Sequence, residues 1–144
     1  MGSAARPVCE ILLVEDNPAD ANLLRSCLAE AAFDFRVSVV GDGDGALAFL
    51  RREGAYADRA LPDMILLDLN LPGRDGREIL AEIRGHPEWK AIPIVVLTSS
   101  QSPSDVRMSY ARGADRYLTK PIDLDGYDAI VVALEALQRA RQGG

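Results

Sequence analysis

The chain has 144 residues, which fits one domain and is too short for an enzyme with a cleft between two lobes. Its 16 Lys and Arg stand against 22 Asp and Glu, and the net charge of −6 argues against nucleic acid as a partner. Hydrophobic residues make up 48% of the chain, yet no apolar run approaches the roughly 20 residues of a membrane span and no signal peptide is apparent, so we expect no membrane contact and a cytoplasmic location.

Five short apolar runs alternate with segments of helical length, which predicts a parallel sheet covered by helices. The runs cover residues 11–14, 37–40, 64–67, 94–97 and 116–118. The first, third and fourth are continuously apolar, as in central strands that are buried on both faces. We therefore predict an α/β, flavodoxin-like, doubly wound fold with a five-stranded parallel sheet of order 2-1-3-4-5 and five helices.

Capping residues and apolar spacing predict where the helices lie. Asn17 and Pro18 suit the N-cap and first position of a first helix, and the others are expected over residues 44–53, 76–84, 102–112 and 124–141. The fourth carries few apolar side chains, which predicts a mobile element. Residues 1–8 and 142–144 are expected to be tails around a domain at 9–141, in which Cys9 and Cys27 act as small buried hydrophobes.

Polar residues follow four of the five predicted strands, where ligands bind in open α/β sheets. They are Glu15, Asp16, Asp68, Thr98 and Lys120. If the strands have the predicted order, three carboxylates converge at one edge and need a counter-ion, for which Mg²⁺ with its oxygen ligands is the natural candidate. A carboxylate, Mg²⁺, an ammonium group and a hydroxyl together suit the transfer of a phosphoryl group to Asp68 as nucleophile.

The chain resembles response-regulator receiver domains over about residues 10–141. The resemblance is carried by four motifs in order, Ile-Leu-Leu-Val-Glu-Asp-Asn from residue 11, Leu-Leu-Asp-Leu-Asn-Leu-Pro from 66, Val-Leu-Thr-Ser-Ser from 96 and Tyr-Leu-Thr-Lys-Pro from 117. It implies that a sensor histidine kinase phosphorylates Asp68 and that the domain turns over no separate substrate. The implied Mg²⁺ ligands, for which Mn²⁺ can substitute, are Glu15, Asp16, Asp68 and the backbone carbonyl of Asn70.

The resemblance also implies how the phosphoryl group is sensed. Thr98 and Tyr117 would form a coupled switch, Lys120 would bind the phosphoryl group, and the Lys120–Pro121 peptide would be cis. A half-buried strand aromatic is an equally simple interpretation of Tyr117. The segments at residues 50–56 and 120–125 are similar to stand-alone receivers paired with bacterial phytochromes, which implies a bacteriophytochrome as the kinase and a further protein as the downstream target.

Two other functions fit part of this pattern. An aspartyl-nucleophile phosphatase of the haloacid dehalogenase type also places Asp, Thr and Lys at strand ends, but it uses a second Asp as general acid where this chain has Asn70. A pseudo-receiver would keep the fold as a binding module without phosphorylation, although such a chain is expected to lose site residues that are present here.

The last predicted helix has two apolar faces. The first is expected to cover the sheet and consists of Tyr127, Ile130, Val131, Leu134 and Leu137. The second consists of Ala129, Val132, Ala133, Ala136 and Ala140, and one sheet cannot bury it as well. A two-fold homodimer would bury this face, and the alternative is a solvated face of good helix formers. The resemblance to receiver domains implies the homodimer, formed through the last strand and helix.

Overall fold

Five parallel strands form one sheet in the computed structural model, which describes residues 6–143 of the chain. The strands are β1 (Val8–Val14), β2 (Asp34–Val40), β3 (Met64–Leu67), β4 (Ile94–Thr98) and β5 (Arg116–Thr119). Their spatial order is β2-β1-β3-β4-β5, which confirms the predicted topology. The strands β1 and β3 are neighbours, with Val14 opposite Leu67, so the residues that follow these strands emerge side by side.

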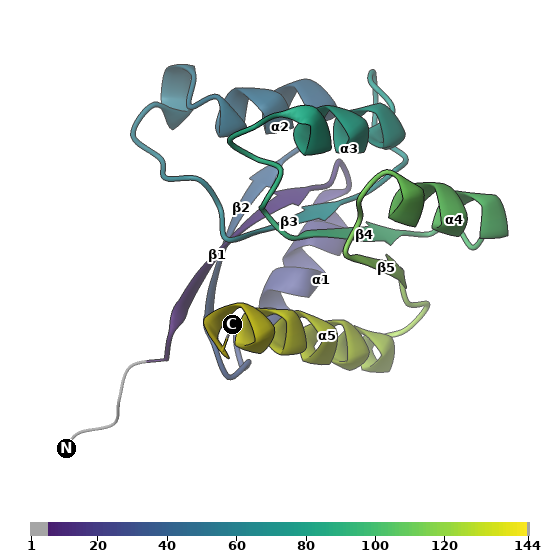
Figure 1. Cartoon of the computed structure of the whole chain (residues 1–144). Helices are drawn as coiled ribbons and strands as arrows, with labels where there is room; N and C mark the ends of the chain where they lie inside the picture. Colours follow the sequence, from purple (N-terminus) through teal and green to yellow (C-terminus); the bar gives the residue numbers. More distant parts are fainter. Residues whose placement is uncertain (1–5, 144) are drawn as a thin grey trace.

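Helices cover both faces of the sheet (Figure 1). They are α1 (Pro18–Leu28), α2 (Gly43–Leu50), α3 (Gly76–Gly85), α4 (Pro103–Ala111) and α5 (Leu124–Gly143). The helices α1 and α5 lie on one face, and α2 and α3 lie on the other (Figure 1). The predicted N-cap of α1 is confirmed, since Asn17 Oδ1 accepts hydrogen bonds from the backbone N–H groups of Ala19 and Asp20.

Alternate residues of the central strands face opposite layers, and each layer has its own core. Leu12, Ile65 and Leu67 pack against α2 and α3 in what we call the α2/α3 core. Leu13 and Leu66 face α1 and α5 in the α1/α5 core. The sheet-facing side of α5 is confirmed, because its predicted residues are buried or partly buried in the α1/α5 core: Tyr127, Ile130, Val131, Leu134 and Leu137.

The helix α4 contributes little to either core. Its buried residue is Ser109, whereas Val106 and Met108 are half-buried and Tyr110 is exposed. The sequence therefore correctly indicated that this helix is weakly anchored by apolar contacts.

Several predicted boundaries are wrong. Residues 1–5 of the expected tail lie outside the described residues, but Val8 already belongs to β1, and the Pro7 carbonyl accepts a hydrogen bond from Asp34 N. At the other end, α5 continues to Gly143. The second helix ends at Leu50 because Arg52 adopts a left-handed φ of 57°, after which Gly54–Tyr56 forms a short 3₁₀ turn.

Both cysteines are free thiols, and neither belongs to the group of residues within 6–143 that could hold a metal ion. Cys9 is fully buried as predicted, and burial raises the pKa of its thiol to about 12, whereas Cys27 is only half-buried. Within residues 6–143, no helix combines the length and apolarity needed to cross a membrane.

Candidate functional site

The carboxyl ends of four neighbouring strands bring the predicted polar residues together. Glu15 directly follows β1, Asp68 follows β3, Thr98 ends β4 and Lys120 follows β5. Backbone hydrogen bonds fix these ends, with Asp68 N donating to Val14 O and Lys120 N donating to Thr98 O at 2.8 Å. Parallel pairing thus explains why residues as distant in the sequence as Glu15 and Lys120 share one site.

Lys120 lies at the centre of the site. Its Nζ is 2.8 Å from Asp68 Oδ2 and 2.6 Å from Glu15 Oε1. Burial disfavours the Lys120 charge, but hydrogen bonds to these carboxylates outweigh burial and raise the pKa of the ammonium group. For Glu15, burial raises the pKa of the carboxyl group, and the hydrogen bond with Lys120, which lowers that pKa, offsets only part of this effect.

A third carboxylate, Asp20 in the first turn of α1, also contacts Lys120, at 3.0 Å from Nζ. Asp20 could not be recognised as a site residue from the sequence, because an acidic residue at this helix position is fully explained by the helix dipole.

Glu15, Asp16 and Asp68 form a cluster suited to a hard cation. One carboxylate oxygen from each lies within 4.8 Å of the others, with Glu15 and Asp68 buried and Asp16 exposed. The site contains four carboxylates, including Asp20, and one ammonium group, so a divalent cation with oxygen ligands would neutralise the excess negative charge. These residues therefore fit Mg²⁺ or Mn²⁺, and a role for the Asn70 carbonyl stays a prediction.

Asn70 links Asp68 to Thr98. Its backbone N–H donates to Asp68 Oδ1 at 3.0 Å, and its side-chain amide donates to Thr98 Oγ1 at 3.4 Å. Thr98 is fully buried, so its hydroxyl is held near Asp68 rather than in solvent.

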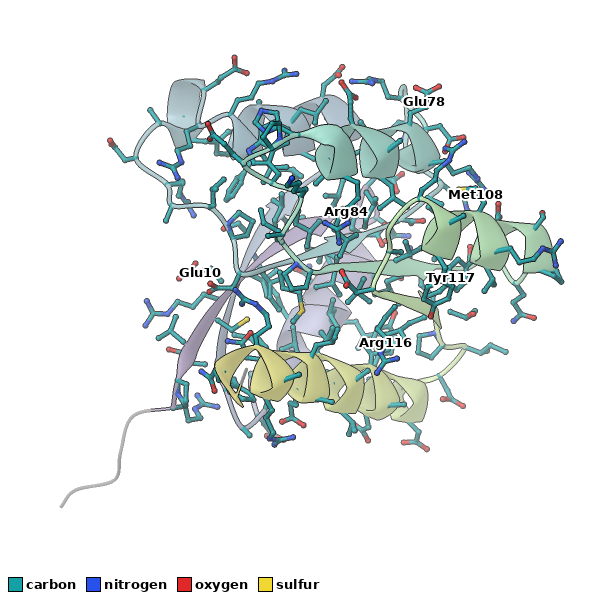
Figure 2. All side chains as sticks on the ribbon, in the orientation of Figure 1. Glu10, Glu78, Arg84, Met108, Arg116 and Tyr117 are labelled. Atoms are coloured by element: carbon teal, nitrogen blue, oxygen red, sulfur yellow. The ribbon has the colours of Figure 1, made fainter. Side chains whose placement is uncertain are left out.

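Tyr117 occupies the side of β5 that faces α4, where it is labelled in Figure 2. Its ring packs against the α2/α3 core, and its hydroxyl donates to the backbone carbonyl of Ser100 at 2.9 Å. This contact joins Tyr117 to the loop that follows Thr98. The contact is compatible with a switch, which stays a prediction.

The predicted cis peptide is wrong for this structure. The Lys120–Pro121 bond is trans, and Lys120 reaches Asp68 from this conformation. A peptide bond before proline favours trans by only about 0.5–1 kcal/mol, so local sequence alone does not determine the isomer.

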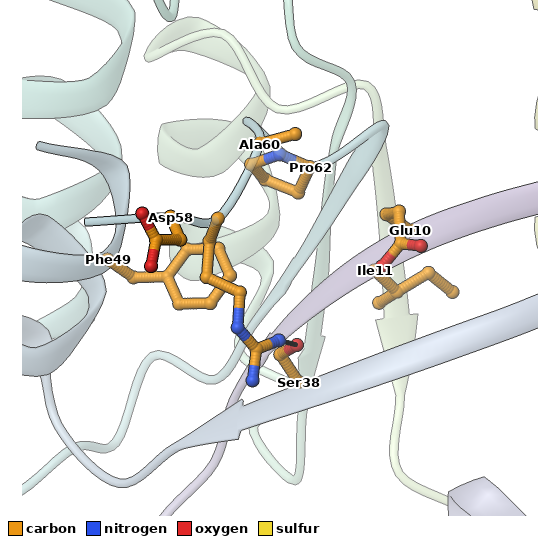
Figure 3. A pocket seen from close by; sticks show the side chains of 8 residues that line it. Glu10, Ile11, Ser38, Phe49, Asp58, Ala60 and Pro62 are labelled. Carbon is orange, nitrogen blue, oxygen red and sulfur yellow. Dashed lines mark hydrogen bonds between the residues drawn. The ribbon is translucent and has the colours of Figure 1, made fainter. Parts of the chain in front are cut away.

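A separate cavity of about 230 Å³ lies near the opposite end of β1 (Figure 3). It is lined by residues that include Glu10, Phe49 and Arg59, and Arg59 donates to Ser38 Oγ at 3.0 Å. None of the residues lining this cavity belongs to the carboxylate site.

Comparison with known proteins identifies relatives for nearly the whole chain. Residues 11–132 match the family model described as the response regulator receiver domain. Response regulator Rcp1 of Synechocystis sp. is 43% identical over 136 residues, which cover 94% of this chain and 92% of that protein.

Solved structures agree with this match. The phosphorylated cyanobacterial phytochrome response regulator RcpA superimposes with a TM-score of 0.82 at 45% identity, covering 92% of both chains. The bacteriophytochrome response regulator RtBRR gives a TM-score of 0.74 at 40% identity, covering 87% of this chain and 76% of that one. The manganese-bound form of Rcp1 gives a TM-score of 0.82 at 44% identity, covering 89% of this chain and 92% of that one.

Proposed function

Because the chain belongs to the response regulator receiver domain family, we propose that it is a phosphorylation-dependent signalling domain with Asp68 as its phosphoacceptor. The observation that carries this proposal is the position of Asp68. Its buried carboxylate belongs to the acidic cluster that is suited to a cation, and it lies 2.8 Å from Lys120 Nζ. This combination suits an incoming phosphoryl group, which is highly charged and needs cations on more than one side.

Each residue of the site has a separate role in the proposed phosphoryl transfer. An Asp68 carboxylate oxygen attacks the phosphorus of a phosphohistidine or of acetyl phosphate, the bond from phosphorus to the donor breaks, and its electron pair leaves with the donor. The product is an acyl phosphate on Asp68. Lys120 then has a phosphoryl oxygen to bind, and Thr98 supplies a buried hydroxyl donor. A Mg²⁺ or Mn²⁺ ion, which Glu15, Asp16 and Asp68 would hold, would supply further positive charge at the site.

The phosphodonor is proposed to be a sensor histidine kinase of the bacteriophytochrome class. The support is that RcpA and RtBRR, both similar to this chain over most of its length, are described as phytochrome response regulators. The phosphorylated domain would then act on a downstream protein through a changed surface and turn over no separate substrate.

Intact-mass measurement after incubation with acetyl phosphate and Mg²⁺ tests the central claim. We expect one phosphoryl adduct that survives acid and is lost in base, is absent in Asp68→Asn, and fails to form in EDTA. Asp44→Asn, which alters an exposed carboxylate of α2, is the matched control and should label normally. Stoichiometric labelling of Asp68→Asn would remove Asp68 from this role.

The same assay separates the other functions. An unlabelled wild-type protein would indicate a pseudo-receiver. Turnover of p-nitrophenyl phosphate that is lost in Asp68→Asn would indicate a phosphatase. Asn70, which cannot act as the general acid of such a phosphatase, argues against that outcome.

The exposed face of α5 is proposed to form a homodimer. The predicted stripe lies away from the sheet, with Ala129, Val132, Ala136 and Ala140 exposed and Ala133 half-buried. Val132 is 61% exposed, and small neighbours would allow two helices to approach closely. Replacing Val132 and Ala136 with Glu should give monomers in sedimentation while Asp68 still accepts phosphate. A wild type that is monomeric at tens of micromolar would contradict the dimer.

A further inference from the structure

Polar contacts, rather than apolar ones, attach α4 to the rest of the molecule. Helices α1, α2 and α3 each bury leucine or isoleucine side chains, whereas the buried residue of α4 is Ser109. The position of α4 and of the β4–α4 loop before it therefore depends on a small number of hydrogen bonds and ion pairs.

The strongest of these contacts joins α3 to α4. Arg77, in the first turn of α3, binds Asp105, in the first turn of α4, through two parallel contacts. Arg77 Nε lies 3.0 Å from Asp105 Oδ1, and Nη2 lies 2.7 Å from Oδ2. The side chains are only 26% and 16% exposed, so the pair is better shielded from water than an ordinary surface ion pair.

Asp105 also holds the β4–α4 loop. Its Oδ2 accepts a hydrogen bond from Ser100 Oγ at 2.6 Å, and Ser100 Oγ accepts one from Ser102 N at 3.3 Å. The Ser100 carbonyl accepts the Tyr117 hydroxyl. Ser100, two residues after Thr98, thus takes part in three hydrogen bonds, with Asp105, Ser102 and Tyr117.

We propose that the Arg77–Asp105 ion pair, together with the Ser100–Asp105 hydrogen bond, forms a latch that holds the β4–α4 loop and α4 in the resting position. Arg77 and Asp105 are positioning residues in this proposal, which rests on the proposed function because the latch restrains the response of Thr98 to a phosphoryl group on Asp68.

The contacts of Thr98 explain why phosphorylation would work against the latch. At rest, the Thr98 hydroxyl meets the Asn70 amide at 3.4 Å, which is a long hydrogen bond. The hydroxyl oxygen is the acceptor in that contact, and phosphoryl oxygens on Asp68 would offer its proton a charged acceptor. Movement of Thr98 toward them pulls on Ser100, whose side chain is tied through Asp105 to α3. A contact made in only one of two states shifts their populations, so the latch favours the resting state.

The electrostatics of the pair agree with this role. Hydrogen bonds from Arg77 and Ser100 hold the pKa of Asp105 below its usual value, so its carboxylate stays charged throughout the neutral range. The latch would therefore respond to phosphorylation and not to moderate changes in pH.

Arg77→Gln tests the latch, because it removes the guanidinium and leaves Asp105 in place at the start of α4. Arg74→Gln is the matched control, since Arg74 makes the same kind of pair with Glu82 but does not contact the β4–α4 loop. Two readouts apply to each protein. Hydrogen exchange over residues 99–111 reports the resting loop, and calorimetric titration with beryllium fluoride, a non-reactive phosphoryl mimic, reports the Kd of the switched state.

In Arg77→Gln we expect faster exchange over residues 99–111 without phosphate and a Kd for beryllium fluoride lowered about fivefold, as fits the loss of one shielded ion pair. Arg74→Gln should match the wild type in both. The double variant with Asp105→Asn should add little to Arg77→Gln, because the Arg77–Asp105 contact is lost only once. It can exceed Asp105→Asn alone, because Arg77→Gln also removes the contact of Arg77 Nη1 with Asp75 Oδ1 at 3.0 Å. If Arg77→Gln does not fold, the Asp105→Asn single variant tests the latch with the same two measurements.

Unchanged Kd in Arg77→Gln, with or without faster exchange, overturns the latch, since a merely structural pair would loosen α4 without favouring the switched state. Intact mass after acetyl phosphate treatment keeps the two proposals distinct. Normal phosphorylation of Asp68 with unchanged Kd contradicts the latch alone, whereas a wild type that takes up no phosphoryl group contradicts the proposed function and the latch with it.

Discussion

At the scale of single residues, the position of Lys120 dominates the site. Its ammonium group contacts Glu15, Asp20 and Asp68, and the Glu15 and Asp68 side chains are only 4% and 6% exposed. Carboxylates that are so poorly hydrated depend on a partner cation, because water cannot stabilise their charge.

Lys120→Met should therefore lower the free energy of unfolding in EDTA by about 3 kcal/mol, the cost of leaving buried charges unpaired. Mg²⁺ should restore part of this loss, because it binds the folded cluster and not the unfolded chain. Urea unfolding followed by circular dichroism, with and without Mg²⁺, measures both effects. Lys90→Met, at an exposed position, is the control. An equal loss in EDTA and in Mg²⁺ would contradict the cation site.

At the scale of elements, backbone geometry determines where one helix ends and where another begins. The helix α2 ends in a Schellman motif, with Arg52 N bonded to Phe49 O and Glu53 N bonded to Ala48 O. Glycine usually occupies the left-handed position of this motif, which Arg52 holds here at a φ of 57°.

Arg52→Gly should raise the free energy of unfolding by about 0.5–1 kcal/mol, because glycine adopts this conformation without steric cost. Arg51→Gly is the matched control. Arg51 has a helical φ of −77°, so there the same change should destabilise the protein. Thermal unfolding of the two variants compares them directly, and equal effects would contradict the strain assigned to Arg52.

The start of α3 lies directly against the segment that carries Asp68. A Cβ on Gly76 would collide with the Asp68 carbonyl and come within 2.7 Å of Leu69 Cα. Gly76→Ala should therefore lower the free energy of unfolding by about 1–3 kcal/mol and slow phosphorylation, since backbone must move. Gly85→Ala, at the open end of the same helix, should do neither. Acetyl phosphate labelling rates, together with urea unfolding, decide between these outcomes.

Sequence patterns predicted most of this architecture because burial determines it. The runs at 64–67 and 94–97 can only be central strands, and their order places Asp68 beside Glu15 and Lys120. The chemistry of the cation cluster followed from that placement alone.

The features that sequence missed depend on contacts between distant side chains. Asp20 resembled an ordinary first-turn carboxylate until the fold brought it to Lys120. Arg77 and Asp105 each resembled helix-end residues, and only tertiary structure pairs them. The end of α2 was missed because Arg52 replaces the glycine that would have marked it.

At the scale of the whole molecule, the sheet joins two cores that share no helix. Trp89 belongs to the α2/α3 core and Leu66 to the α1/α5 core, yet β3 supplies residues to both. Because a strand cannot unfold on one face only, both cores should unfold together.

Leu66→Ala should lower the free energy of unfolding by about 3 kcal/mol, since this side chain is fully buried. The urea midpoint should fall equally by circular dichroism and by Trp89 fluorescence, although Trp89 lies on the opposite face. Val39→Ala, at a position that is 37% exposed, should change neither midpoint by much. Separate midpoints for the two signals would show that the layers unfold independently.

The buried hydroxyl of Ser109 adds a consequence for the energy landscape. Within the described part of the chain, Ser109 Oγ has no hydrogen-bond partner, in a helix that buries no large apolar side chain. Most native contacts support one another, but here a polar group is desolvated without compensation. The resting position of α4 is thus locally frustrated. This cost, about 1–3 kcal/mol, narrows the energy gap between the resting position of α4 and positions in which the hydroxyl is hydrated, as a domain needs if one phosphoryl group is to change its surface.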